Sequence, residues 1–255
     1  IRGYVLRLPL DVLVVASANP EDYTNRGRII TPLRDRFGAE IRTHYPIELD
    51  DEVAVIRQEG HLVAGVPPVI LEILARYTRA LRQSPAINQT SGVSARFAIA
   101  GAETVAAAAL RRASVRGEDE AVARIIDLDA AVEVLAGKIE FESGEEGREQ
   151  DILDHLLRMA TAEAVRAHFH GLDMGDLVAA LDGHTTVTTG ELVTAREFLE
   201  GLPSLNGSSL YDDIGERLGA TNDGQRAAAV ELALEGLYLA RRISKDSDDE
   251  ATVYG

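Results

Sequence analysis

Three short segments of the chain carry polar side chains whose types and positions suit phosphate binding. The first holds Asn19, which follows the apolar run 10–18 and precedes Pro20. Ligands of open α/β sheets bind beyond the carboxyl ends of the strands, so an amide at this point can orient a water molecule or contact a phosphate. The alternative is that Asn19 and Pro20 simply begin a turn, and the spacing alone favours the turn.

The second segment, 32–38, reads PLRDRFG and contains Asp35 and Arg36. If this segment is helical, Leu33 and Phe37 share the face that points to a core, and Arg36 projects away from it. An arginine held in this way can reach a phosphate presented by another subunit and stabilise the charge on a transferring phosphoryl group. The alternative is a solvated helix face, on which an Arg–Asp pair contributes little energy.

The third segment, 91–97, reads SGVSARF and places Arg96 near an expected helix start, beside the apolar Phe97. The helix dipole disfavours a cation near a helix N-terminus. Arg96 is therefore a better candidate for an anion ligand than an average surface arginine, although a solvated arginine explains the residue equally well when it is taken alone.

The first 46 residues are expected to form strands and one short helix that position Asn19 and Arg36. The run 10–18 is short, β-branched and apolar, which is typical of a strand buried on both faces of a parallel sheet. A short helix is expected from Thr31, as N-cap, to Gly38. The alternating segment 40–45 predicts a second strand.

The rest of the chain is expected to be helical. Four apolar residues form the clearest amphipathic stripe: Ile70, Leu74, Tyr77 and Leu81. Further helices are expected at about 51–59 (capped by Asp50), 93–113 (capped by Ser91), around 125–135, and at 151–170, 173–182, 190–200 and 224–243. The acidic, glycine-bearing segment 139–150 predicts a linker, and 245–255 a frayed acidic tail. The expected fold is mainly α with a partial α/β core.

Composition limits the class of protein. The chain has 255 residues, of which 45% are hydrophobic and 27% charged, enough for one large or two modest globular domains. The longest apolar run is too short to span a membrane. There is no cysteine and no visible secretory signal, so a cytoplasmic location is expected. The net charge of −16 argues against nucleic-acid binding by the whole surface.

The charge is unevenly distributed along the chain. Residues 1–45 contain seven Arg and five Asp or Glu, a balance of +2, so the remaining residues carry −18. A locally basic segment in an acidic chain suggests a small anionic ligand near that segment.

In their order along the chain, these three segments resemble an AAA+ ATPase. The stretch 8–45, LPLDVLVVASANPEDYTNRGRIITPLRDRFGAEIRTHY, is similar to the second half of the ATPase core in the magnesium chelatase ATPase-subunit and MoxR-like group. The resemblance covers about residues 1–137. It implies that 1–46 is a remnant of the α/β core, 47–138 a helical lid and 151–244 a further helical domain to which the resemblance assigns no function.

The resemblance also implies roles for the three sites. Asn19 matches the sensor-1 asparagine that positions the attacking water. Arg36, with Asp35 before it, matches the arginine finger that reaches the γ-phosphate of a neighbouring subunit. Arg96, in the S-x-R context of residues 94–96, matches the sensor-2 arginine at the nucleotide phosphates. The implied ligands are ATP and Mg²⁺, the implied assembly is a ring (commonly a hexamer), and a von Willebrand factor A domain protein is a plausible partner.

The sequence departs from the family pattern in one important respect. It has no G-x-x-x-x-G-K-[ST] phosphate loop and no apolar run that ends in Asp-Glu. Both precede sensor 1 in the family, and this chain begins with Ile1, so we expect an N-terminally truncated ATPase that neither binds ATP tightly nor hydrolyses it alone. Because the loop between sensor and finger is long, the ATPase assignment is firmer than insertion of a metal into a porphyrin.

Several alternatives remain open on the sequence. Arg26 and Arg28 are rival arginine fingers, ranked below Arg36 because a loop holds an arginine less rigidly. The whole chain could instead be a non-enzymatic helical module that binds a partner, and a DNA-linked AAA+ relative is a weaker option that the acidic charge disfavours. The pair His168 and His170 is more plausibly a surface feature than a metal site, because residues i and i+2 on a helix face different directions.

Overall fold

The computed structural model describes residues 11–17, 35–89, 91–181, 185–205, 207–247 and 251–255. The chain separates into two compact units, Ile1–Thr43 and His44–Gly255, and each is described by itself. Nine helices and one small antiparallel sheet lie in the described part of the chain, so the fold is mainly α.

The strand predicted at 10–18 does not form in its described residues, 11–17, which have no regular structure. Their apolar side chains are open to solvent, with exposures of 66% for Val12, 91% for Leu13, 65% for Val14 and 83% for Val15. A strand of a parallel sheet needs hydrogen-bonded neighbours and a cover on both faces. No described residue of the first unit supplies either, so residues 11–17 have no strand to pair with inside that unit.

The other two elements predicted before residue 46 are also wrong where the structure describes them. Residues 35–38 form a turn and a bend instead of a helix, and 40–45 form no strand. Phe37 is 38% exposed and Ile41 87% exposed. A helix this short is not stable without apolar packing, and here neither side chain is buried.

The second unit begins with four helices. These are α2 (Leu49–Glu59), α3 (Pro68–Gln83), α4 (Ala95–Arg116) and α5 (Asp127–Ala136). Helix α3 starts with proline at its first position, where the missing N–H costs nothing. All four residues of its predicted stripe are buried, and the stripe prediction is confirmed. The predicted caps are wrong, because Glu48 precedes α2 and Ser94, not Ser91, precedes α4.

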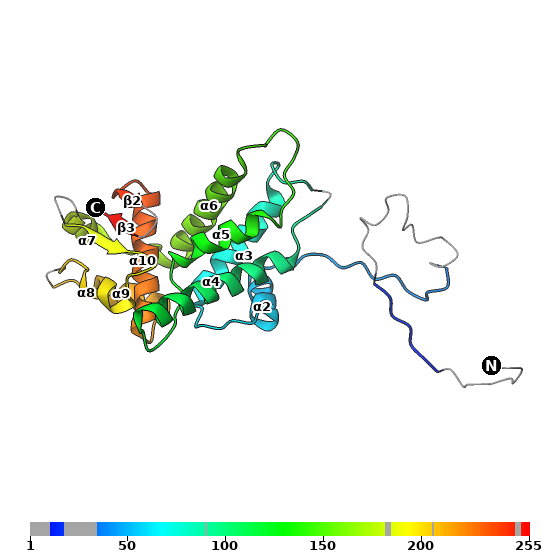
Figure 1. Cartoon of the computed structure of the whole chain (residues 1–255), viewed down its shortest axis with the longest axis horizontal. Coiled ribbons are helices and arrows are strands. Elements are labelled where there is room, and N and C mark those ends of the chain that lie inside the picture. The colour runs from blue at the N-terminus through cyan, green and yellow to red at the C-terminus, as the bar shows by residue number, and fades with distance from the viewer. Residues whose placement is uncertain (1–10, 18–34, 90, 182–184, 206, 248–250) are drawn as a thin grey trace, which may run out of the picture. The chain divides into compact units, whose positions relative to one another are not determined.

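Five more helices follow: α6 (Glu149–Phe169), α7 (Gly175–Leu181), α8 (Ala195–Glu200), α9 (Leu210–Arg217) and α10 (Asp223–Leu239). The sequence predicted all of these except α9. Figure 1 shows α3, α4, α5 and α6 gathered into a bundle, and α10 between this bundle and the smaller elements α7, α8 and α9. Helix α10 packs on α6 along one side and on α8 and α9 along the other. It is therefore the central helix of the unit, and every one of its residues from Ala227 to Leu237 is buried.

The predicted frayed tail is instead part of a sheet. Strands β2 (Lys245–Ser247) and β3 (Thr252–Tyr254) pair antiparallel, and β3 also pairs with β1 (Val187–Thr189), which gives the order β1-β3-β2. The last strand is thus the central one. Tyr254 is only 1% exposed. Its burial holds in place a segment whose acidic composition predicted exposure to solvent.

The described residues contain no parallel sheet, which corrects that part of the predicted fold; Gly65 and Val122 form a lone parallel bridge. No described helix combines the length and the apolar character that a membrane crossing requires.

Candidate functional site

The structure places the predicted site residues in two separate units. Asn19 lies outside the described residues. Asp35 and Arg36 lie in an exposed turn of the first unit, whereas Arg96 lies in α4 of the second. The structure therefore gives the surroundings of each arginine within its own unit.

Arg96 is the second residue of α4 and is exposed. Within the described residues it makes no hydrogen bond or ion pair, and the first turn of α4 holds no acidic residue that would offset the helix dipole. Its neighbour Phe97 is 3% exposed and packs on Tyr77, with ring centroids 5.8 Å apart. The buried Phe97 fixes this turn of the helix, so the guanidinium of Arg96 projects from a rigid base.

A buried ion pair holds the loop that leads into α4. The carboxylate of Glu52 accepts two hydrogen bonds of 2.8 Å from Arg82, and Arg82 Nε donates to the carbonyl of Val93 at 2.8 Å. Glu52 is 1% exposed. The guanidinium of Arg82 also lies 3.9 Å from the centre of the Tyr45 ring. Paired charges of this geometry are rigid, so Arg82 positions the backbone three residues before Arg96.

A second group of buried charges joins α4, α5 and α10, and the sequence analysis missed it. Arg112 donates to Asp127 at 2.5 Å and to the carbonyl of Val122 at 2.7 Å. Burial is the main cause that raises the pKa of Asp127, although Arg112 opposes the shift. One signal was available in the sequence: Arg112 occurs at helical spacing from Val105 and Ala109, which are both buried.

The network continues through Arg124 and Glu231. Arg124 is fully buried and donates to the carbonyls of Val193 (2.6 Å) and Gly190 (3.2 Å). Glu231 accepts from the Ile125 amide at 3.1 Å and from the Thr189 hydroxyl. Burial raises the pKa of Glu231, and the charge of Arg124 opposes this. These contacts tie the segment before α5, the loop before α8 and α10 into one structure, so we assign the network to stability.

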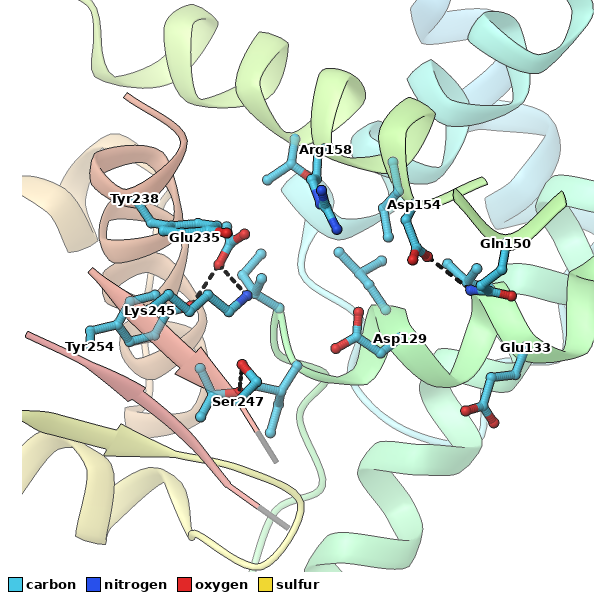
Figure 2. Close-up of a pocket in the computed structure, with 17 residues that line it drawn as sticks. Asp129, Glu133, Gln150, Asp154, Arg158, Glu235, Tyr238, Lys245, Ser247 and Tyr254 are labelled. Carbon is cyan, nitrogen blue, oxygen red and sulfur yellow. Dashed lines mark hydrogen bonds and ion pairs between the residues drawn. The ribbon is translucent and has the colours of Figure 1, made fainter. Parts of the chain in front are cut away.

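A cavity of about 460 Å³ lies between α5, α6, α10 and the β2–β3 hairpin (Figure 2). Its charged lining comes from four elements: Asp129 and Glu133 from α5, Asp154 and Arg158 from α6, Glu235 from α10 and Lys245 from β2. Apolar wall comes from residues such as Leu128, Val132 and Leu157. The volume is within the range of small-molecule sites.

Part of the charge in this cavity is neutralised internally. Lys245 donates to Glu235 at 2.8 Å, and the Tyr254 hydroxyl donates to the same oxygen at 2.6 Å. Asp129, by contrast, has no hydrogen bond or ion pair within the described residues. Its pKa is raised, first by limited hydration and then by the charges of Glu235, Asp154 and Glu133, although Lys245 opposes the shift.

Metal binding finds no support in the described residues, which contain no group of three or more His, Asp or Glu placed to hold an ion. His168 bonds through Nε2 to Glu72 at 2.7 Å, and Phe169 between the two histidines is buried. The two histidines therefore do not form a shared site.

No protein-family model, no curated protein and no solved structure matches this chain.

Proposed function

We propose that this chain is part of an AAA+ ATPase subunit similar to the magnesium chelatase and MoxR group. In this proposal Asn19 orients the attacking water and Arg36, after Asp35, reaches the γ-phosphate of a neighbouring subunit. Arg96 contacts the phosphates from the helical unit. The observation that carries the proposal is Arg96: an exposed arginine without a partner in the described residues, at the start of a 22-residue helix and on a rigid base.

The electrostatics of α4 support this role for Arg96. A cation in the first helical turn is disfavoured by about 0.3–1 kcal/mol, and no acidic residue of that turn offsets this cost. A bound phosphate reverses the sign, because it is attracted both by the guanidinium and by the helix N-terminus. Arg96 therefore gains most when an anion is present, which is the behaviour that a nucleotide-sensing residue needs.

The proposal requires parts that these 255 residues do not contain. With no phosphate-loop motif in the sequence, the loop that binds ATP and Mg²⁺ must belong to other residues of the protein or to another chain. The apolar run 10–18 would then pair with strands of that part. Assembly as a ring, commonly a hexamer, and a von Willebrand factor A domain partner belong to the same proposal. The 255-residue chain alone is expected not to hydrolyse ATP.

The test is ATP turnover by the longest natural form of the protein, with Arg36→Ala and Arg96→Ala as variants. Loss of an arginine finger lowers kcat by about 10³-fold or more, so we expect this for Arg36→Ala. Arg42→Ala, another exposed arginine of the first unit, should stay within about twofold of wild type. Arg57→Ala, on the exposed surface of α2, is the matched control for Arg96→Ala.

Mixing subunits distinguishes action in trans from local damage. Arg36→Ala and a phosphate-loop variant should each be inactive alone and regain activity when they are mixed. Full activity of Arg36→Ala would assign the finger to Arg26, Arg28 or Arg34 instead. No turnover by the assembled wild-type protein would overturn the ATPase proposal.

One observation favours the second candidate, a non-enzymatic interaction module. The four apolar side chains from Val12 to Val15 are at least 65% exposed, and such runs are typical of surfaces that another protein covers. If the assembled protein has no ATPase activity but replacing Val12 and Val14 with Asp abolishes its assembly, the module becomes the better description.

A further inference from the structure

The cavity between α5, α6, α10 and the β2–β3 hairpin has no role in the proposed ATPase, yet it has the features of a binding site. It encloses about 460 Å³, a volume typical of sites for small molecules. Its wall combines apolar side chains with charged ones from four different segments of the chain (Figure 2).

The charged groups that line the cavity are of two kinds, those paired with another protein group and those without such a partner. Glu235 is occupied by Lys245 and Tyr254, at 2.8 and 2.6 Å. Asp129 and Arg158 are exposed at the mouth of the cavity and make no hydrogen bond or ion pair within the part of the chain that the structure describes. In Figure 2, Arg158 projects from α6 and Asp129 from α5 toward the same space, where a ligand would meet both.

Asp154 adds a second carboxylate on the α6 side. It lies one turn before Arg158, at the spacing of a helical ion pair, but no ion pair joins them. Its Oδ1 accepts from Gln150 at 2.9 Å instead, which leaves the other oxygen for a ligand. The cavity therefore presents a guanidinium without a protein partner in the described residues, together with two carboxylates that can accept from a cation.

We propose that this cavity binds a small basic amino acid, a ligand that carries one carboxylate and two ammonium groups. The carboxylate pairs with Arg158, and the ammonium groups pair with Asp129 and Asp154. This assignment pairs each of these charges with an opposite one, and hydrogen bonds between two charged groups are stronger than those between neutral groups.

Two simpler ligand classes fit the cavity less well. A divalent metal ion needs several converging oxygen or nitrogen ligands, and the described residues include no such group. A plain anion would meet four carboxylates against two cations, namely Asp129, Glu133, Asp154 and Glu235 against Arg158 and Lys245. That excess of two negative charges favours a ligand with net positive charge.

The raised pKa of Asp129 agrees with this geometry. Desolvation is the largest cause of this shift, and the nearby charges of Glu235, Asp154 and Glu133 also disfavour the ionised form. An ammonium group beside Asp129 would offset these charges. Binding is therefore expected to strengthen as the pH rises and Asp129 loses its proton.

The test is calorimetric titration of the 255-residue chain with three probes that share the carbon skeleton of lysine: L-lysine, cadaverine and hexanoate. Cadaverine lacks the carboxylate, and hexanoate lacks both ammonium groups. L-lysine should bind with saturation, cadaverine about tenfold more weakly because it loses the charged contact to Arg158, and hexanoate not measurably. The readout involves no nucleotide, so its result is independent of the ATPase proposal.

Two variants assign the contacts. Asp129→Asn should weaken both L-lysine and cadaverine about tenfold or more, whereas Arg158→Gln should weaken L-lysine and leave cadaverine unchanged. The controls are Asp151→Asn and Arg166→Gln, which remove the same charges from exposed positions of α6 outside the cavity. Circular dichroism and the unfolding midpoint confirm that each variant is folded.

Three results would overturn the proposal. The first is no saturable binding of L-lysine at millimolar concentration. The second is equal affinity for L-lysine and cadaverine, since Arg158 would then have no ligand carboxylate. The third is a loss of affinity in the control variants as large as in Asp129→Asn, because general surface charge would then explain the binding.

Discussion

The Nε atom of Arg124 lies 3.6 Å from Oε1 of Glu231, and both side chains are almost completely buried. Far apart in the sequence, these two residues join the segment before α5 to the central helix α10. The pairing is incomplete, because the Nε and Nη1 atoms of Arg124 have no hydrogen-bond partner within the described residues. Removing one partner of such a pair leaves the other charge buried and uncompensated.

We therefore expect Arg124→Met to destabilise the protein strongly. The variant leaves Glu231 unpaired and removes the donors to the carbonyls of Gly190 and Val193. Breaking a buried ion pair from one side costs about 3–5 kcal/mol, to be measured as the free energy of unfolding in urea.

Arg111→Met is the control for Arg124→Met. Arg111 lies on α4, is 62% exposed and pairs with Glu191 at the surface, so its loss should cost at most about 1 kcal/mol. The double variant Arg124→Met with Glu231→Leu should lose less than the two single variants together. Equal losses for Arg124→Met and Arg111→Met would contradict a structural role for the buried pair.

The crossing of α10 over α6 depends on one glycine. A Cβ atom at Gly236 would lie 2.6 Å from Cγ1 of Val165, a distance at which the helices must move apart. Overpacking of this kind costs about 1–3 kcal/mol, and the gain in helix propensity from alanine offsets at most about 1 kcal/mol. Gly236→Ala should therefore lower the unfolding midpoint in urea.

A comparable glycine without neighbours supplies the control for Gly236→Ala. Gly137 follows α5 with φ −72°, and nothing lies within 4 Å of its Cβ position. Gly137→Ala should change stability by less than about 0.5 kcal/mol. If Gly236→Ala proved as stable as Gly137→Ala, the close approach of α6 and α10 would be wrong.

The helices could be predicted from the sequence because their buried apolar residues recur at the spacing of a helical turn. Ile70, Leu74, Tyr77 and Leu81 fall on one face of α3, and burial of that face stabilises the helix. Helix α9 was missed because it is only eight residues long, with acidic Asp212 and Asp213 in its first turn. Such a short segment shows too few turns for a period to be visible.

Most of the wrong or missed predictions concern contacts between residues that are far apart in the sequence. The run 10–18 has the composition of a buried strand, but a strand depends on partners that local sequence does not specify. The opposite error occurred at the C-terminus, where acidic composition concealed β3 and the burial of Tyr254. The cavity was missed for the same reason, because Asp129, Arg158 and Lys245 come from three separate elements.

The burial of the C-terminal strand β3 can be tested directly by replacing Tyr254. Tyr254 is 1% exposed, and its hydroxyl donates to Glu235 at 2.6 Å. Replacing a buried aromatic residue with alanine costs about 3–5 kcal/mol, so Tyr254→Ala should be among the least stable variants in thermal or urea unfolding. Asp246→Ala, at an exposed position of β2, should unfold like wild type. A frayed tail would instead make the two variants equivalent.

Loss of the capping box of α8 should lower the stability less than the loss of Tyr254 does. The Thr194 hydroxyl accepts from the Glu197 amide at 3.1 Å, and the Glu197 carboxylate accepts from the Thr194 amide at 2.9 Å. Loss of such a cap costs about 1 kcal/mol, which we expect for Thr194→Ala. Hydrogen bonds from Thr194 lower the pKa of Glu197, so its contribution is present above the unfolded pKa and is lost as the pH falls through the folded value. The difference in urea midpoint between wild type and Thr194→Ala should accordingly shrink in acid.

Asp129 predicts a pH dependence of the opposite sign. Its pKa is raised in the folded protein above the value near 3.9 of an unfolded aspartate. Between these two values the folded state holds more protons than the unfolded state, so the contribution of Asp129 to the free energy of unfolding falls as the pH rises. Asp129→Asn removes this loss, and the variant should be more stable than wild type at pH 7 and equally stable below the unfolded pKa. Urea unfolding of both proteins across this pH range measures the difference, with Asp151→Asn, which lies outside the cavity, as the control. A difference that grows toward acid would contradict the raised pKa.

A gain in stability at pH 7 that accompanies weaker binding of L-lysine would show that Asp129 is retained for its ligand at the expense of folding stability.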